Sequence, residues 1–584
     1  MRRLMSSFVL CATALAMEAT AIDNAHAAWV ANGVALSPNA SNYKPVIASD
    51  GATGSIIAWY GGPGSDIFVR RVLGDGSIAP GWPLTTPLVV CGATGLQEQP
   101  VIVADGTGGA LIFWQDARNG TDYDIVAQHI TALGQVVSTP SSNWVPDGLA
   151  VLSAAGNQYQ PQAVTDNAGG AIVVWQDGRQ GSGNYDIYAQ RLDGDGNLLW
   201  ALSGVPVCVA ANNQINPAIV EDGAGGAYIA WQDYRKGNEY DIYVQHITAD
   251  GLVYPDTRWT SNGLGVCTAS FSQFYPVVTR DSTGGAFVAW QDFRTGTDNH
   301  IFAQHLTAQG ALVAGWPANG TPVCQAQYSQ YYPVIASDGG SGVFIAWQDY
   351  RDGATNHIYS QHLTSGNSSW TTDGIAVTTA TNGQFSPQIT ADGGGGEFIA
   401  WYDSRNGSTN DIFVHQVSRT GVLNPAWDRN GLPVCTAPNT QQFPVLTKSS
   451  IGTATMTWQD LRAGDLTTAA IFAQQTTGPS VPTGVGDRLN SGGGLKLSAP
   501  RPNPTRGGSD LWLTLSASTG VNVEVLDVAG RHIATLASGM LPAGVHDLSW
   551  NGRTDHGGRV AAGVYLVRVQ APGFDRTQRI VRLK

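Results

Sequence analysis

The sequence predicts an all-β fold made of eight repeated units, followed by a smaller β-domain. Three observations lead to this prediction. A W-Q-D-x-R phrase recurs through the first 476 residues, as in "YIAWQDYRKG" (228–237) and "FIAWQDYRDG" (344–353). A proline stands 14 positions before the tryptophan of every copy, although the copies lie 54 to 61 residues apart. Beyond residue 476 the phrase is absent. A constant core with loops of variable length is typical of repeat proteins. The repeat tryptophans are Trp59, Trp114, Trp175, Trp231, Trp290, Trp347, Trp401 and Trp458.

Each unit is expected to contain four strands. In residues 333–386 these are "PVIASD", "VFIAWQD", "HIYSQHLT" and "DGIAVTT", and the polar loop "YRDGATN" joins the second strand to the third. The second strand is apolar at both alternating sets of positions, so both of its faces should be covered. Four-stranded sheets that pack face to face against their neighbours form a β-propeller.

The two ends of the repeat region predict a closed ring. Residues 29–43 match the end of the seventh unit (427–443), whereas the eighth unit (444–476) has three strands and no fourth. Pairing the orphan N-terminal strand with the incomplete unit removes two exposed edges, and an open array would instead need polar capping repeats. The sequence therefore predicts an eight-bladed β-propeller over residues 28–476, whose last blade is completed by the N-terminal strand.

The N-terminus and the composition predict an exported protein. Arg2 and Arg3 precede an apolar stretch and a small-x-small site at 25–27, so residues 1–27 resemble a signal peptide cleaved near Ala27/Ala28. No other segment is long and apolar enough to span a membrane. The net charge of −13 argues against nucleic acid as a partner. We expect a secreted or bacterial cell-surface location.

The cysteines and the repeated tryptophans are expected to be packing residues. Equivalent cysteines of successive units should lie too far apart for disulfides, and a tryptophan required once per unit is most simply part of the core. The five mature cysteines are Cys91, Cys208, Cys267, Cys324 and Cys435. Seven units also carry Asp two residues and Arg four residues after the tryptophan. We expect each Arg to tie its loop to an Asp across the hairpin, for example Asp124, Asp186 or Asp241.

The candidate ligand surface is the end of the ring that carries the second-to-third-strand loops and the connections between units. A glutamine stands three residues before the repeat proline in seven units, and aromatic residues follow it. His300 and His357 replace an Asp in the fifth and sixth units and are the clearest local departure from symmetry. The alternative interpretation is that the amides bond the backbone between blades. The candidate ligand-binding residues are Gln158, Gln214, Gln273, Gln330, Gln384, Gln441, Tyr159, Phe274, Tyr331, His300 and His357. No catalytic residue, metal site or cofactor is predicted.

The repeat resembles the TolB-type propeller repeat, in which a similar S-D-R-x-G-x-x-D-I-Y phrase joins the second and third strands. This resemblance covers nearly all of residues 45–476. It implies a propeller fold and no particular activity.

The tail predicts a linker (477–495) and a small β-sandwich of about seven strands (496–584). It resembles the FlgD-like immunoglobulin fold and the type A C-terminal sorting domain of type IX secretion, which implies outer-membrane secretion machinery as a partner. The residues that carry this resemblance include Asn503, Pro504, Gly530, Gly563 and Tyr565.

The function that follows is a secreted or surface-displayed propeller that binds a glycan or a protein. One alternative is an extracellular glycan hydrolase or lyase with its site over the central channel. Another is a structural component of a surface coat. An enzyme should gather unique acid, base or metal residues in one or two blades, and the sequence shows little of that.

Overall fold

The computed structural model describes residues 29–477 apart from 39, 138–141, 182, 254–257 and 365–366. It also describes 495–497, 505, 509–515, 518–528, 530–541, 544–555, 557–572 and 574–583. The chain divides into two compact units, Met1–Pro479 and Ser480–Lys584. The predicted signal peptide (1–27), nearly all of the predicted linker and the Asn503-Pro504 pair lie outside the described residues.

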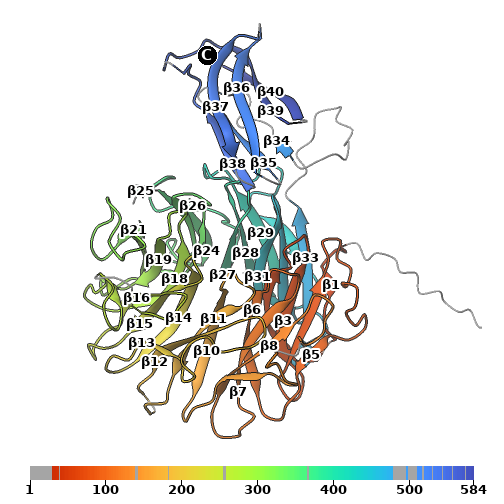
Figure 1. Ribbon diagram of the computed structural model, residues 1–584, viewed down its shortest axis with the longest axis vertical. Coiled ribbons are helices and arrows are strands. Elements are labelled where there is room, and N and C mark those ends of the chain that lie inside the picture. Colours follow the sequence, from red (N-terminus) through yellow and green to blue (C-terminus); the bar gives the residue numbers. More distant parts are fainter. Residues whose placement is uncertain are drawn as a thin grey trace, which may run out of the picture. The chain divides into compact units, whose positions relative to one another are not determined.

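Strands form eight antiparallel sheets in the described part of the first unit (Figure 1). The first four sheets contain β2 (Asn42–Ser49), β3 (Ser55–Gly61), β4 (Asp66–Val72), β5 (Leu88–Cys91); β6 (Gln97–Ala104), β7 (Ala110–Asp116), β8 (Asp124–Ile130), β9 (Leu149–Leu152); β10 (Gln158–Thr165), β11 (Ala171–Asp177), β12 (Asp186–Leu192), β13 (Val205–Cys208); and β14 (Gln214–Glu221), β15 (Ala227–Asp233), β16 (Asp241–Ile247), β17 (Leu264–Cys267).

The other four sheets contain β18 (Gln273–Arg280), β19 (Ala286–Asp292), β20 (His300–Leu306), β21 (Thr321–Cys324); β22 (Gln330–Ser337), β23 (Gly342–Asp349), β24 (His357–Thr364), β25 (Asn367–Ser368), β26 (Ile375–Ala376); β27 (Gln384–Ala391), β28 (Glu397–Asp403), β29 (Asp411–Val417), β30 (Leu432–Cys435); and β31 (Gln441–Ser450), β32 (Thr453–Asp460), β33 (Ala470–Thr477), β1 (Val34–Ala35). The predicted fourth strand of the sixth sheet is shortened to β26, after which the N–H groups of Val377 and Thr378 both donate to the carbonyl of Ile358.

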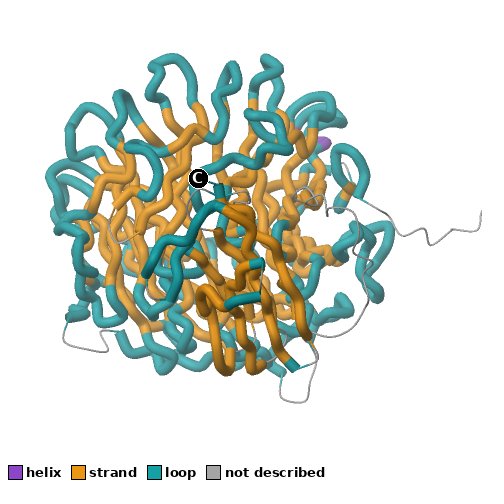
Figure 2. Tube along the Cα trace, turned by 90° about the horizontal axis from the view of Figure 1, so that it is seen from above, coloured by secondary structure: helices purple, strands orange, loops and turns teal. Residues whose placement is uncertain are grey.

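The sheets follow one another around a ring. The first strand of each sheet contacts the first strand of the next, and β31 contacts β2. We refer to the sheets as blades 1 to 8 in this order. In Figure 2 strands and the loops between them make up almost the whole of the described chain, and the one helix in the described part is the short 3₁₀ turn η1 (Leu466–Thr468). The all-β prediction is confirmed.

The N-terminal segment completes blade 8. Strand β1 pairs with β33, with Val34 opposite Ala473 (Figure 1). Asn32 accepts a hydrogen bond from the Thr436 N–H of blade 7 at 2.9 Å, as Asn262 and Asn319 do for their preceding blades. The indole N–H of Trp29 reaches the carbonyl of Gly74 in blade 1 at 2.9 Å. The orphan strand therefore makes the same contacts as the fourth strands of other blades.

The core consists of clusters between neighbouring blades. All eight repeat tryptophans are fully buried on the second strands. A second set of tryptophans, one before each fourth strand and likewise expected to pack because it recurs once per unit, comprises Trp29, Trp82, Trp144, Trp200, Trp259, Trp316, Trp370 and Trp427. Of these, Trp82, Trp144 and Trp200 each donate to a backbone carbonyl of the following blade. As predicted, both sets serve packing.

The second unit holds two sheets. One contains β34 (Leu495–Leu497), β35 (Ser509–Leu515) and β38 (Gly544–Trp550), and the other contains β36 (Thr519–Asp527), β37 (His532–Leu541), β39 (Gly563–Ala571) and β40 (Phe574–Arg582). Trp550 and Tyr565 lie 4.9 Å apart in the core, and the Tyr565 hydroxyl donates to Ala561 O. Gly530 adopts a φ of 77° after β36, and Gly563 opens β39. Tyr565 thus supports the core of this unit.

No helix among the described residues is long and apolar enough to cross a membrane.

Candidate functional site: the loop face

The repeat phrase builds a buried ion pair in seven blades. In blade 5, Asp292 is fully buried and accepts hydrogen bonds from the Trp290 indole at 2.7 Å and from Nε and Nη2 of Arg294 at 2.8 and 2.6 Å. The guanidinium carbon also lies 3.7 Å from the centre of the Phe302 ring. The predicted tie of each Arg to an Asp across the hairpin was wrong. The Arg side chain turns back because two carboxylate oxygens of its own phrase offer a bidentate partner.

The five thiols lie beside these ion pairs. Each is buried and unpaired, as predicted, and Arg294 Nη2 lies 3.3 Å from the sulfur of Cys267. Burial raises the pKa of the Cys91 thiol to about 11 and that of Cys267 to about 12. The phrase and the cysteines therefore stabilise the scaffold.

The predicted glutamines lie inside the loop face. We define the loop face as the end of the first unit that carries the second-to-third-strand loops and the fourth-to-first-strand connections; the opposite end is the turn face. Gln273 and Gln330 have no exposed surface. Their side-chain amides donate to the backbone carbonyls of Phe271 (2.8 Å) and Tyr328 (2.9 Å). The same burial and backbone bonding hold for Gln158, Gln214, Gln384 and Gln441. We therefore assign these amides a supporting place: they fix the connections that carry the aromatic residues.

At two junctions between blades, His300 and His357 provide a hydrogen-bond partner for the side-chain oxygen of the glutamine in the next blade. Nδ1 of His300 lies 3.0 Å from Oε1 of Gln330 in the next blade, and Nδ1 of His357 lies 2.9 Å from Oε1 of Gln384. Where an Asp occupies this position, as in blades 2, 3, 4 and 7, the glutamine oxygen of the next blade has no partner among the described residues. The two histidines thus supply a donor that a carboxylate lacks.

Asp186 of blade 3 is the clearest case of a carboxylate at this position that has no hydrogen-bond donor in the part of the chain that the structure describes. It is 1% exposed, and neither of its carboxylate oxygens has a hydrogen-bond partner within the described chain. Burial, together with the nearby charge of Asp177, raises its pKa to about 6.

Two positions of the connections hold the backbone in the left-handed region. One lies five residues before the repeat proline, in blades 2 to 8, and the other lies directly before the proline in all eight blades. At the second position a β-bulge shifts the register in every blade, as between Phe274 and Val277. The bulged N–H of Tyr275 is held by Gln232 Oε1 of the preceding blade at 2.8 Å. Such a bulge re-aims the side chain of the bulged residue.

At the first position most blades have residues that suit a positive φ, whereas the residues at the second position are varied. Glycine and asparagine adopt positive φ most readily. At the first position, blades 2, 3, 4, 7 and 8 have Gly95, Gly156, Asn212, Asn382 and Asn439. At the second position, blades 1 to 4 and 7 have Lys44, Gln99, Gln160, Asn216 and Ser386, and blade 8 has Phe443.

Blades 5 and 6 place aromatic residues at both positions. Phe271 and Tyr275 of blade 5 have φ of 64° and 51°, and Tyr328 and Tyr332 of blade 6 have φ of 61° and 50°. Their side chains are 43–51% exposed. A bulky residue in this region costs about 1–2 kcal/mol. Strain of this kind, held by the surrounding structure, is concentrated at functional sites.

The four strained residues lie among further aromatic rings of the loop face in blades 5 and 6. Tyr275 and Tyr332 lie 5.2 Å apart across the blade junction, and Tyr332 lies 6.2 Å from Tyr331. Phe271 packs on Gly296 and lies edge-on to Phe293, and Tyr328 packs on Gly353 and lies edge-on to Tyr350. We call this group the blade 5–6 aromatic surface; its members are Phe271, Phe274, Tyr275, Phe293, Tyr328, Tyr331, Tyr332 and Tyr350.

A cavity adjoins this surface on the blade 4 side. Its volume is about 540 Å³, and its walls combine aromatic rings with short polar side chains. Tyr240 of blade 4 extends the series of rings, 6.1 Å from Phe274. The lining residues are Asn238, Glu239, Ser270, Phe271, Ser272, Phe274 and Phe293.

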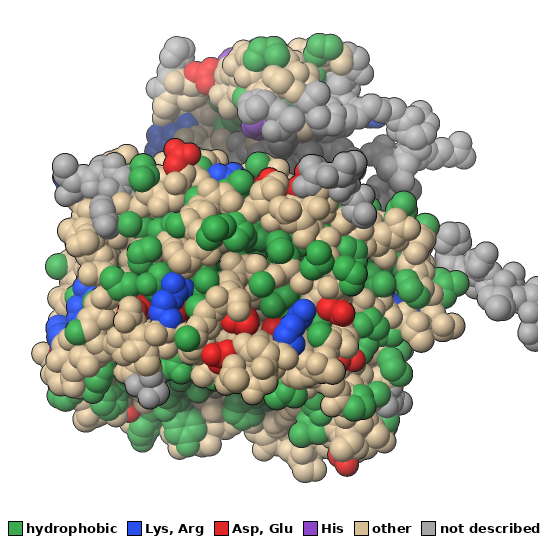
Figure 3. All heavy atoms as spheres, turned by 60° about the horizontal axis from the view of Figure 1, so that its bottom comes forward, with side chains coloured by type: hydrophobic (Ala, Val, Ile, Leu, Met, Phe, Trp, Pro, Cys, Tyr) green, Lys and Arg blue, Asp and Glu red, His purple; other side chains and the backbone are tan. Residues whose placement is uncertain are grey.

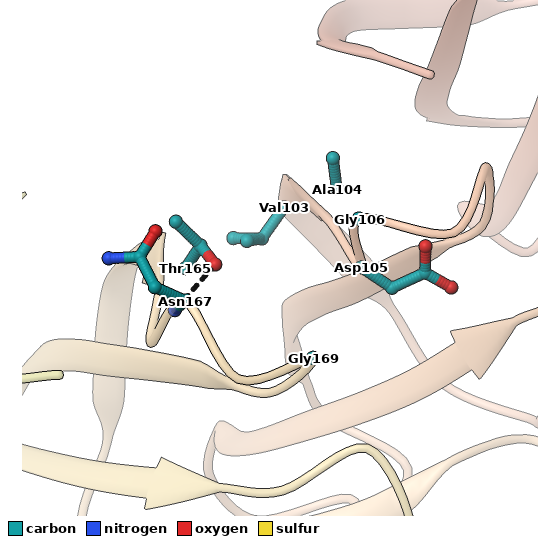
Figure 4. A pocket seen from close by; sticks show the side chains of 7 residues that line it. All are labelled: Val103, Ala104, Asp105, Gly106, Thr165, Asn167 and Gly169. Carbon is teal, nitrogen blue, oxygen red and sulfur yellow. Dashed lines mark hydrogen bonds between the residues drawn. The ribbon is translucent and has the colours of Figure 1, made fainter. Parts of the chain in front are cut away.

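The turn face has a smaller hollow of about 380 Å³ between blades 2 and 3 (Figure 4). It is lined by small residues such as Gly106 and Gly169, and the Asn167 N–H donates to Thr165 Oγ1 at 2.9 Å. Its carboxylate, Asp105, is occupied by His129 at 3.0 Å. This hollow offers few groups for a ligand.

Sequence reasoning placed Phe274 and Tyr331 on the loop face, and the structure brings both into the aromatic surface. Tyr159 lies apart from it, in a separate group with Tyr123 and Tyr185. The sequence analysis missed Tyr275 and Tyr332. The sequence does distinguish these two tyrosines, because they stand directly before the repeat proline, where five of the other six blades have polar residues.

A unique acid lies between blades 6 and 7. Glu397 is fully buried where five other blades have alanine, and its Oε1 lies 2.7 Å from the Ser360 hydroxyl oxygen. That hydroxyl also lies 3.1 Å from the carbonyl oxygen of Ile345, and one proton cannot serve both acceptors. Burial raises the Glu397 pKa to about 8, and the charge of Asp392 adds to it. Glu397 is therefore a neutral acid, and it has no access to the surface.

Comparisons with known proteins agree with the all-β architecture. Residues 505–573 match the FlgD Ig-like domain, which confirms that part of the C-terminal prediction. No curated protein matches the chain in sequence. The TolB-like assignment of the repeats stays a prediction.

Several solved structures share partial likeness. The Hadza microbial sialidase Hz136 is 11% identical, with 70% of this chain and 73% of that chain covered and a TM-score of 0.34. The endo-arabinase from Bacteroides thetaiotaomicron is 14% identical, with 47% and 97% covered and a TM-score of 0.25. PorZ, a surface component of the type-IX secretion system of Porphyromonas gingivalis, is 12% identical, with 91% and 74% covered and a TM-score of 0.23. At these scores no activity is carried over to this chain.

Proposed function

We propose that this chain is a secreted or cell-surface propeller that binds a glycan or a protein at its loop face. The observation that carries the proposal is the strained and exposed aromatic group of blades 5 and 6. The left-handed backbone repeats around the ring, whereas exposed aromatic side chains occupy both of its positions in blades 5 and 6. Exposed aromatic clusters of this kind mark binding sites on otherwise soluble surfaces.

The C-terminal unit supports export. Its FlgD Ig-like match and its basic end, "RIVRLK", agree with a sorting domain that engages outer-membrane secretion machinery. In this proposal the second unit delivers the propeller, and the propeller binds the ligand.

Enzyme activity has weaker support. The clearest unique acid, Glu397, is sealed between two blades. The ion pairs of the repeat phrase are seven near-equal copies rather than one asymmetric pair of acid and base.

A blocking experiment tests the loop face. Thr297 is an exposed residue of the blade 5 loop, and Thr107 is an exposed residue on the turn face. Each is replaced by cysteine and coupled to a polyethylene glycol maleimide; the native thiols are buried and should not react. Binding to printed glycan and peptide panels should fall for modified Thr297→Cys and persist for modified Thr107→Cys. Equal binding by both conjugates would refute the proposal.

Export is tested separately. The full chain and a chain ending at residue 479 are expressed in a Gram-negative host with type IX secretion. Only the full chain should become accessible to protease on intact cells.

A further inference from the structure

The blade 5–6 aromatic surface has the chemistry of a carbohydrate site. We propose that it binds a neutral glycan chain by stacking sugar rings on Tyr275, Tyr332, Phe271 and Tyr328; this inference rests on the proposed function and names its ligand class. The C–H face of a sugar ring is apolar and packs on an aromatic ring, while its hydroxyl groups need hydrogen-bonding partners at the edge of the site.

The rings are arranged for an extended ligand. Tyr240, Phe274 and Tyr275 follow one another at 6.1 and 6.3 Å, and Tyr332 continues the series 5.2 Å beyond Tyr275. The series therefore crosses blades 4, 5 and 6 without interruption, which a single small molecule would not require.

The rings are also held in place before a ligand arrives. Gln232 and Gln291 bind the N–H groups of Tyr275 and Tyr332, and the buried amides of Gln273 and Gln330 bind the preceding carbonyls. A site whose side chains are already ordered loses less conformational entropy on binding.

Polar groups for sugar hydroxyls line the cavity at the end of this series. Asn238, Ser270, Ser272 and Glu239 stand beside Phe271 and Phe274. They provide both donors and acceptors.

The charges of the site favour a neutral ligand. The connections 268–275 and 325–332 contain no Lys or Arg, and the loops 291–299 and 348–357 contain only Arg294 and Arg351. Both guanidinium groups are bound by a buried aspartate at 2.6 Å. Lys236 of the neighbouring blade is paired with Glu239 and Asp241. An anionic glycan would find no available cation in these segments. Figure 3 shows a different side of the molecule, where a few Lys, Arg, Asp and Glu side chains lie among hydrophobic and uncharged ones.

Asparagine substitutions test the proposal without endangering the fold. The full chain carrying Tyr275→Asn and Tyr332→Asn has at both positions the residue that blade 4 already has there, Asn216. Relief of the left-handed strain should raise the melting temperature by about 1 °C or more. The matched control is Gln99→Asn with Gln160→Asn, which introduces the same residue at the same backbone position in blades 2 and 3.

Binding is measured by migration in native gels containing arabinan, xylan, galactomannan or mixed-linkage β-glucan. Titration calorimetry with a hexasaccharide of the retarding polymer then gives the affinity. We expect at least one neutral polymer to retard the full chain, the tyrosine variant to bind at least about tenfold more weakly, and the control to bind normally.

Three results would overturn the inference. The first is that no neutral polymer retards the protein. The second is that the tyrosine and control variants bind equally. The third is that polygalacturonate or a proline-rich peptide binds at the loop face while the neutral polymers do not; the proposed function would then stand and the glycan class would be wrong.

Discussion

Replacing Glu397 with glutamine should remove a pH dependence from the stability of the propeller. The folded state keeps the Glu397 carboxyl protonated up to about pH 8, whereas the unfolded chain releases this proton near pH 4.5. Stability is therefore fully present below pH 4.5 and falls as the pH rises through this window. At about 1.4 kcal/mol per pH unit, the loss reaches at most about 5 kcal/mol. Relaxation around the buried charge reduces it, and we expect at least about 2 kcal/mol.

The assay compares urea unfolding of the full chain and Glu397→Gln by tryptophan fluorescence at pH 4.5, 6, 7 and 8.5. The glutamine amide can donate to Ser360 Oγ and does not titrate. The other ionisable groups near this junction, Asp392, Asp338, His362 and Arg419, are the same in both proteins, so their titration cancels in the difference. The advantage of Glu397→Gln should grow with pH and level off above about pH 8. A difference that stays constant across the four pH values would refute the assignment of a neutral acid.

Three further predictions concern the scaffold. Asp292→Ala leaves the Arg294 guanidinium and the Trp290 indole without their buried acceptor, so the free energy of unfolding in urea should fall by about 3–5 kcal/mol; a loss below about 1 kcal/mol would contradict the role given to the ion pair. The five buried thiols have raised pKa values, about 12 for Cys208 and Cys435, so iodoacetamide at pH 8 should label them only in urea, and mass spectrometry of the native protein would reveal any exception. Deleting residues 29–37 exposes the edge of β33 and should cause oligomers in size-exclusion chromatography; a monomer with an unchanged melting temperature would argue against closure by this strand.

The ring could be predicted because its causes are local and repeated. A second strand apolar at every position, such as 343–347, must be covered on both faces, and a chain that begins with a spare fourth strand and ends with three must pair them. The bonds of Asn32 and Trp29 to neighbouring blades bear out this reasoning. The partner of each arginine was predicted wrongly, because the sequence does not show that the two oxygens of Asp292 already face the guanidinium of Arg294.

The candidate site was harder to predict because burial depends on the bulge. From the sequence alone, Gln273 and Tyr275 are neighbours on one polar connection. In the structure the bulge turns Gln273 inward to the carbonyl of Phe271 and leaves Tyr275 43% exposed. Spacing along the chain gives no indication of which of the two points outward. The sign of φ determines which side chain points outward, and an aromatic residue in the sequence does not indicate a positive φ.

The bulge also explains how the exposed side chain of one blade can change without disturbing the ring. The backbone of Tyr332 is fixed by Gln291 of the preceding blade, and that amide bonds only the main-chain N–H. The side chain at this position is exposed and takes no part in the cores between blades. Substitution there changes the surface while the contacts that set the geometry of the ring persist. Asn216, Ser386 and Tyr332 occupy this position on the same bulge in three blades, so the surface of the loop face can vary independently of the fold.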